Sequence, residues 1–155
     1  MAEDLSEIKR VLRSAYWMQK RLDADLEYLA RLRAKAEAVG VRYDRLRVSC
    51  EEHKVPEEAA CAIVDYEKKI EVQIECWKVT LQRVTEIIYN VPSQNLEVLL
   101  QMRYLNFWTF EKIAAELGYS WRHVNRLHVA ALKEANAVYR SLKGKAAERS
   151  GPFFI

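Results

Sequence analysis

The sequence predicts an all-α protein in which a long antiparallel coiled-coil helical hairpin precedes a C-terminal domain of shorter helices. The first observation is that the 155 residues include only 4 Gly and 3 Pro. Proteins rich in tight turns need both residue types, whereas long helices exclude them. The second observation is a pair of apolar repeats with helical spacing in residues 1–90. The third is a succession of helix caps in residues 91–143.

The first predicted helix begins near Leu5 and carries apolar residues at alternating steps of three and four. This spacing is typical of the a/d seam of a coiled coil. The seam consists of Leu5, Ile8, Leu12, Ala15, Gln19, Leu22, Leu26, Leu29, Arg33 and Ala36. Gly40 follows where a left-handed C-terminal residue is expected, so Gly40 is predicted to end the helix.

The second predicted helix starts at Pro56, after a linker at residues 41–55 that has no sustained period. Proline is favoured in the first helical turn, and the acidic Glu57 and Glu58 suit the positive end of the helix dipole. The second seam consists of Ile63, Glu67, Ile70, Ile74, Trp77, Leu81, Val84 and Ile88. Two such helices can fold back as a hairpin or pair with a second copy as a homodimer, and the pattern permits both.

No metal, cofactor or catalytic site is predicted in this half of the chain. Cys50 and His53 have the spacing of half a zinc site, but no second pair of ligands accompanies them. Cys50, Cys61 and Cys76 are interpreted as free thiols, which fits a reducing compartment. The aromatic residues on or near the seams are interpreted as core packing, and these are Trp17, Tyr66 and Trp77.

Residues 91–143 contain three predicted helix starts in close succession. Ser93 can cap a first helix, which is followed by a break at residues 106–108. Thr109 can cap a short helix over residues 110–117, and Gly118 can supply a left-handed turn after it. Tyr119 is predicted to tuck inward. The last start is at Ser120, which can cap a further helix beginning at Trp121.

The two helices on either side of Gly118 have the residues that a helix-turn-helix needs. Ala114 is small at the point where the second helix crosses the first. The shared core is predicted to consist of Ile113, Leu117, Val124 and Leu127. Because the caps, the turn glycine and the core positions fall in one register, the sequence predicts a helix-turn-helix domain over residues 91–143.

These residues resemble region 4 of bacterial sigma factors. The similarity covers roughly residues 93–138 and rests on the stretches 99–105, 109–120, 124–128 and 131–133. With its helical N-terminal half included, the whole chain resembles small phage transcriptional regulators of the RinA and ArpU type. That resemblance implies action on late genes in phages or prophages of Gram-positive bacteria. No segment resembles the sigma region that binds the −10 promoter element, so a complete sigma factor is not expected.

The resemblance places base contacts on the first two turns of the helix that starts at Trp121. Carried over position by position, these residues are Trp121, Arg122, Asn125 and Arg126. The helical period agrees, because it turns them away from Val124 and Leu127. Arginine commonly reads guanine and asparagine can pair with adenine in the major groove. Phosphate contacts are predicted for Lys112, Thr109, Ser120, His123 and Lys133.

The charge distribution supports double-stranded DNA as the partner of the C-terminal third. Through Asn90 the chain has 16 Lys and Arg against 17 Asp and Glu, and from Val91 onward it has 9 against 5. These net charges of −1 and +4 add to the total of +3. All the excess positive charge therefore belongs to the part with the predicted helix-turn-helix. Residues 144–155 are predicted to be a flexible tail that ends in Phe153, Phe154 and Ile155.

The first predicted function is a sequence-specific DNA-binding transcription regulator of phage or prophage genes, acting in the cytoplasm of a bacterial host. The alternatives are a DNA-packaging protein of the small-terminase kind and a coiled-coil interaction protein that acts on RNA polymerase. An enzyme is not expected, because the sequence has no Gly-rich phosphate loop, metal-ligand cluster or nucleophile elbow. No apolar run has the length of a transmembrane helix, so no membrane contact is expected.

Overall fold

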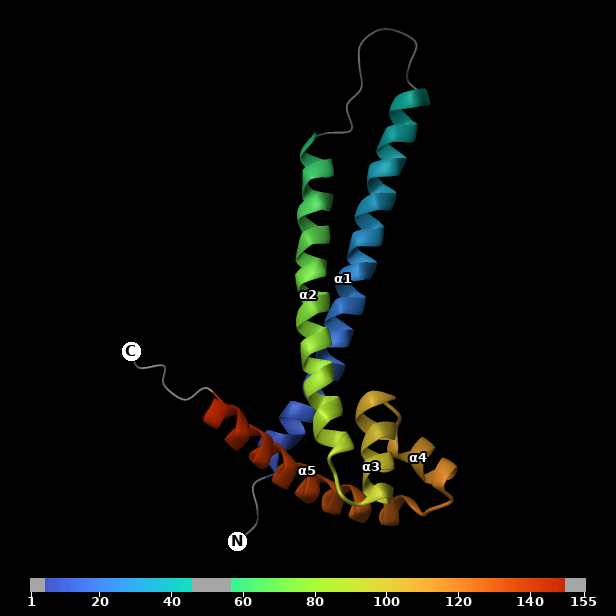
Figure 1. Ribbon diagram of the computed structural model, residues 1–155. Helices are drawn as coiled ribbons and strands as arrows, with labels where there is room; N and C mark the ends of the chain where they lie inside the picture. The colour runs from blue at the N-terminus through green and yellow to red at the C-terminus, as the bar shows by residue number, and fades with distance from the viewer. Residues whose placement is uncertain (1–4, 46–56, 150–155) are drawn as a thin grey trace, which may run out of the picture. The chain divides into compact units, whose positions relative to one another are not determined.

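The computed structural model describes residues 5–45 and 57–149, and all regular structure among them is helical. The α-helices are α1 (Ser6–Arg45), α2 (Glu57–Tyr89), α3 (Gln94–Leu100), α4 (Phe110–Leu117) and α5 (Trp121–Arg149), and a π-helical turn, η1 (Gln101–Leu105), follows α3 (Figure 1). The all-α prediction is confirmed. In the described ranges, no helix has an apolar stretch of the length needed to cross a membrane.

α1 and α2 pack against each other in antiparallel directions, which is the hairpin alternative of the two that their seams permit (Figure 1). Residues 17–78 of this pair form one compact unit, here called the hairpin unit. Its buried apolar residues come from both helices and are Leu22, Leu29 and Ile70, with Ile63, Tyr66 and Ile74 packed around them. The two seams therefore cover each other within a single chain.

Polar residues of the hairpin unit are paired across the two helices. Arg33 and Glu67, both polar seam positions, form an ion pair with each other. The Tyr66 hydroxyl donates a hydrogen bond to the Asp25 carboxylate, and this bond lowers the pKa of Asp25. Because Arg33 and Glu67 neutralise each other, the seams tolerate charged residues at these two positions, where a coiled coil usually has apolar ones.

Two apolar side chains of α1 are more exposed than their positions in the sequence suggest. The interpretation of Trp17 as core packing is wrong, because its side chain is exposed. Trp17 lies two residues from the seam positions Ala15 and Gln19, so it points away from the seam. Leu26 keeps the seam spacing but is also exposed. Tyr66, by contrast, packs against the apolar cluster as expected.

A second compact unit, here called the C-terminal unit, contains the described residues up to Tyr16 and from Val79 onward. The start of α1 and the end of α2 bury Ile8, Leu12, Ala15, Val84, Ile87 and Ile88 in its core. The later elements bury Val91, Leu96, Leu99, Leu100, Tyr104, Ile113, Ala114, Val124, Ala131, Leu132 and Ala135. The core therefore includes turns of both long helices, so the compact units do not divide at residue 90.

Two element boundaries differ from those expected. α1 continues through Gly40 to Arg45, so Gly40 is not its C-cap and the first part of the predicted linker is helical. α5 continues to Arg149, so Gly144 lies inside a helix and the prediction of a flexible tail is wrong for residues 144–149. Glycine lowers helix stability by only about 1 kcal/mol relative to alanine, so neighbouring residues can carry a helix through it. Residues 46–56, with Cys50, His53 and Pro56, and residues 150–155 lie outside the described part.

Ser93 stands at the predicted N-cap position of α3, but its side chain has a different role from capping. Its carbonyl accepts bonds from the backbone N–H groups of Leu96 and Glu97. Its hydroxyl donates to the Glu134 carboxylate of α5 at 2.8 Å, and its backbone N–H donates to the other oxygen at 3.3 Å. Ser93 therefore joins the start of α3 to the middle of α5.

Candidate nucleic-acid interface

The turn between α4 and α5 has the caps and the left-handed residue that the sequence predicts. Thr109 Oγ1 accepts a hydrogen bond from the Lys112 backbone N–H at 3.3 Å. Gly118 ends α4 with φ of 67°, and the following Tyr119 N–H donates to the Ala114 carbonyl at 3.0 Å. Ser120 Oγ accepts from the His123 N–H at 3.3 Å and so caps α5. Residues with a Cβ atom rarely adopt this left-handed φ, so glycine suits position 118 of the turn.

The predicted contact between α4 and α5 also forms. Ile113, Ala114 and Val124 are buried, while Leu117 and Leu127 are half-buried and pack against the same core. Because these residues fix the inner side of α5, its opposite side is left facing solvent over the first two turns.

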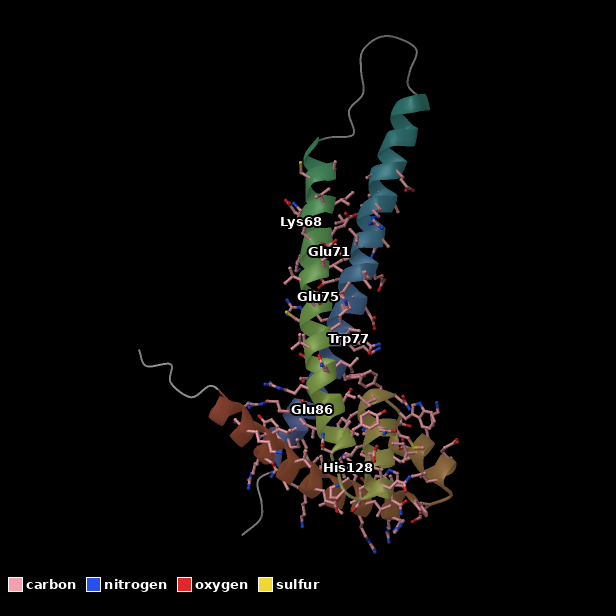
Figure 2. All side chains as sticks on the ribbon, viewed as in Figure 1. Lys68, Glu71, Glu75, Trp77, Glu86 and His128 are labelled. Atoms are coloured by element: carbon pink, nitrogen blue, oxygen red, sulfur yellow. The ribbon has the colours of Figure 1, made fainter. Side chains whose placement is uncertain are left out.

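His128 is a buried residue of α5 that the sequence reasoning missed (Figure 2). Its Nε2 atom is hydrogen-bonded to the Tyr104 hydroxyl at 2.9 Å, and its ring meets the Phe110 ring edge-on. Burial lowers the pKa of His128 to about 4, helped by the positive charges of Arg103 and Lys9. His128 follows Val124 by four residues and precedes Ala131 by three, so the helical period alone places it on the inner side.

The segment before α4 is held by Arg103, whose role was also not foreseen. Its Nη1 atom donates to the Trp108 carbonyl at 2.6 Å, and its guanidinium lies 4.5 Å from the centre of the Phe110 ring. Phe107 in this segment has φ of 57° and packs edge-on against Tyr16. These contacts fix the entry to α4, and α4 in turn supports the start of α5.

The predicted base-contacting residues come together on the first two turns of α5. Arg122 and Arg126 are exposed, and the Trp121 side chain is 55% exposed. Asn125 is half-buried, and its Nδ2 atom donates to the Trp121 carbonyl at 2.9 Å. The Asn125 amide must leave the Trp121 carbonyl before both of its polar atoms can pair with one adenine.

The predicted phosphate-contacting residues lie at three places, with Thr109 and Lys112 at the start of α4, Ser120 and His123 at the start of α5, and Lys133 further along α5. Thr109, Lys112, Ser120, His123 and Lys133 are all exposed. Lys112 Nζ lies 4.0 Å from the centre of the Trp108 ring, which holds its charge near the start of α4. A shallow hollow at the turn is lined by Gly118, Tyr119, Ser120, Arg122, His123 and Arg126. This hollow combines cationic side chains with the N-terminus of α5, which favours an anionic group such as phosphate.

Tyr119 does not tuck inward as expected. Its side chain is 43% exposed, and its ring packs edge-on against His123 with 4.8 Å between ring centres. The inner positions of the turn are already filled by Ile113 and Val124, both fully buried. Tyr119 therefore belongs to the solvent side of the candidate interface, next to the hollow.

The described residues include no group of three or more His, Cys, Asp or Glu side chains arranged to hold a metal ion. Cys61 and Cys76 are exposed and take no part in a disulfide. Comparisons of the chain with protein-family models, with curated proteins and with solved structures find no match. The resemblance to sigma region 4 and to RinA- and ArpU-type regulators thus stays a prediction from the residues.

Proposed function

We propose that the protein is a sequence-specific DNA-binding transcription regulator, in which α4 and α5 form a helix-turn-helix and α5 reads the major groove. The observation that carries this proposal is the pair of exposed guanidinium groups, Arg122 and Arg126, on the capped start of α5. The opposite side of the same turns is anchored by Val124 and His128. Rigid positioning of a reading helix by its buried side is what base recognition requires.

The chemistry of the exposed side favours a DNA duplex over a protein partner. Arg122 and Arg126 can each donate two hydrogen bonds to one guanine edge. Asn125 suits adenine, and Trp121 offers an apolar ring beside them. Of the other residues that suit phosphates, His123 lines the hollow, and Lys112 and Lys133 are exposed on α4 and further along α5. Each good base contact contributes about 1–3 kcal/mol of discrimination, and phosphate contacts contribute most of the affinity.

The resemblance to RinA- and ArpU-type proteins makes phage or prophage late genes the proposed targets. In this proposal, the paired helices α1 and α2 are the N-terminal coiled coil. Because the seams of these helices cover each other within one chain, a homodimer or a contact with RNA polymerase needs another surface of the protein. A dimer would bind half-sites about one helical turn apart, or a multiple of it.

The experiment that tests this function is selection of bound duplexes from random DNA by the full-length protein. We expect one short sequence to be enriched, with guanines at two of its positions. The Arg126→Ala variant should lose preference at a single base pair by about 1–3 kcal/mol and keep its preference elsewhere.

Arg31→Ala is the matched control, because Arg31 is an exposed arginine of the hairpin unit with Glu27 as its ion-pair partner. This variant should select the wild-type sequence. Enrichment of no sequence at low salt contradicts the proposed function. An unchanged preference in Arg126→Ala contradicts the assignment of that residue.

A further inference from the structure

Val129 is an exposed valine on the side of α5 that carries Arg122 and Arg126, here called the reading side. It follows Arg126 by three residues and Arg122 by seven, so the helical period places the three side chains on one side of the helix. The Val129 side chain is 46% exposed and is not part of the apolar core of the C-terminal unit. The reading side therefore continues beyond Arg126 with an apolar group.

The residues next to Val129 fix its place on the surface. His128, directly before it, is buried and is hydrogen-bonded through Nε2 to the Tyr104 hydroxyl at 2.9 Å. Ala131 and Leu132, shortly after it, are fully buried in the core of the same unit. Because the core holds residues on both sides of Val129, this turn of α5 cannot rotate to bury it. Valine has one strongly preferred rotamer in a helix, so its two methyl groups also point in a fixed direction.

The charge around Val129 favours a polyanion as the partner of this turn. Arg126 precedes it by three residues and Lys133 follows it by four, and both side chains are exposed. Residues 121–133 contain no Asp or Glu. An apolar protein surface that covered Val129 would also cover these two cations and leave them without partners, which costs free energy. A DNA duplex supplies phosphates for the cations and base edges for the valine.

Val129 lies within reach of base edges when α5 occupies the major groove. The seven residues from Arg122 to Val129 extend for about 10 Å along the helix axis, at 1.5 Å per residue. The major groove of B-form DNA is about 12 Å wide. The stretch from Arg122 to Val129 therefore fits within the groove.

The base edges in the major groove carry hydrogen-bond donors, acceptors and one apolar group, which is the C5-methyl group of thymine. A valine side chain has neither a donor nor an acceptor. We propose that Val129 packs against a thymine methyl group and so selects a T·A pair near the guanine read by Arg126. This inference rests on the proposed function and adds one base to the sequence that the protein reads.

Such a contact has a size and a character that differ from those of the arginine contacts. Burial of one methyl group corresponds to about a fourfold change in the binding constant. The effect should appear at a single base pair. It should not change the dependence of affinity on salt concentration, because that dependence comes from phosphate contacts.

The test replaces thymine by deoxyuridine, which removes the methyl group and keeps the hydrogen-bonding groups of the base. Each thymine in the duplex selected by the full-length wild type is replaced in turn, and Kd is measured. We expect wild type to bind one of these duplexes about fourfold more weakly than the unmodified duplex. Val129→Ala should bind the two equally well and should have the salt dependence of wild type.

Val72→Ala is the matched control, because Val72 is an exposed valine of α2 in the hairpin unit. This variant should distinguish thymine from deoxyuridine as wild type does. Alanine is a better helix former than valine, so circular dichroism should show wild-type helix content in both variants.

The outcomes separate this inference from the proposed function. If wild type selects no sequence at low salt, the function itself is overturned. If wild type selects a sequence that has no thymine, or in which no deoxyuridine weakens binding, the thymine contact is overturned while the function stands. The contact is also overturned if Val129→Ala still distinguishes the two bases at that position, or if Val72→Ala no longer does.

Discussion

The hairpin unit and the C-terminal unit are both helical, yet they are held together in different ways. In the hairpin unit two helices meet along one line, where three buried apolar residues alternate with polar pairs such as Arg33 with Glu67. The C-terminal unit brings parts of α1 to α5 around fully buried residues such as Leu99 and Leu132. A repeat of three and four residues suffices for the first arrangement, whereas the second depends on segments far apart in the chain.

The largest expected effect tests whether stability resides mainly in the C-terminal unit. Leu99→Ala should lower the free energy of unfolding by about 3–5 kcal/mol, because the cavity lies in a core closed on all sides. Leu29→Ala in the hairpin unit should lower it by about 2 kcal/mol, because the two helices can close partly over the gap. Urea unfolding monitored by circular dichroism measures both.

Leu26→Ala serves as the control for these two variants, because Leu26 is an exposed leucine of the same hairpin. It should change the free energy of unfolding by less than about 1 kcal/mol. Equal losses of unfolding free energy in Leu99→Ala and Leu29→Ala would contradict this prediction, because they would show that the two cores contribute equally to stability.

The second expected effect is a pH dependence of the unfolding free energy that comes from His128 in the C-terminal unit. His128 has a folded-state pKa of about 4, below the value of about 6.5 for an unfolded histidine, so the unfolded state binds its proton more readily. The stabilisation that comes from keeping the His128 imidazole neutral is complete above pH 6.5. It is lost as the pH falls towards 4, and the total loss is about 3 kcal/mol.

Unfolding free energies measured between pH 4 and 7 should therefore fall less steeply in His128→Gln than in wild type. Carboxyl groups such as Glu7 and Asp25 contribute to the slope in both proteins and cancel in the difference. The same pH slope in the two proteins would contradict the burial of a neutral imidazole at this position.

The smallest expected effects come from substituting two glycines of the C-terminal unit. Gly118 has a left-handed backbone, whereas Gly144 lies inside α5. A Cβ atom would meet no neighbour within 4 Å at either Gly118 or Gly144, so conformation alone should decide the outcome. Gly118→Ala should destabilise by about 1–2 kcal/mol, because its φ of 67° is unfavourable for alanine. Gly144→Ala should stabilise α5 by up to about 1 kcal/mol.

Thermal unfolding of these two variants measures the difference. Gly118→Ala should also weaken DNA binding, because the same turn orients α5, whereas Gly144→Ala should leave binding unchanged. A melting temperature that rises in both variants would show that Gly118 does not need its left-handed conformation.

Much of the local structure could be predicted because its causes are local. The caps at Thr109 and Ser120 and the turn at Gly118 depend on residues within four positions of each other. The apolar spacing along α1 and α2 indicates that each helix needs a partner, but their antiparallel pairing within one chain is decided by the structure. Gly40 shows the limit of such rules, because a glycine ends a helix only where the chain must turn.

The residues that were missed or misjudged depend on how the helices pack, although for His128 the helical period already indicates the inner side of α5. His128 is buried because Tyr104 and Phe110 close over it, and Tyr119 is exposed because Ile113 and Val124 already fill the inner positions. Ser93 could be predicted at a helix start, but its bond to Glu134 joins residues 41 positions apart. No local pattern indicates such a pairing.

The sequence by itself determined the helical class, the two seams, the turn and the charged residues at the start of α5. Each of these follows from backbone preference or from periodicity, which act over one or two turns. Only the tertiary structure decided that both long helices contribute turns to the core of the C-terminal unit, and that Arg122 and Arg126 lie exposed while Val124 and His128 are buried in that core. The reason is that burial depends on which distant segments meet, and the sides left over from those contacts form the surface available to a partner.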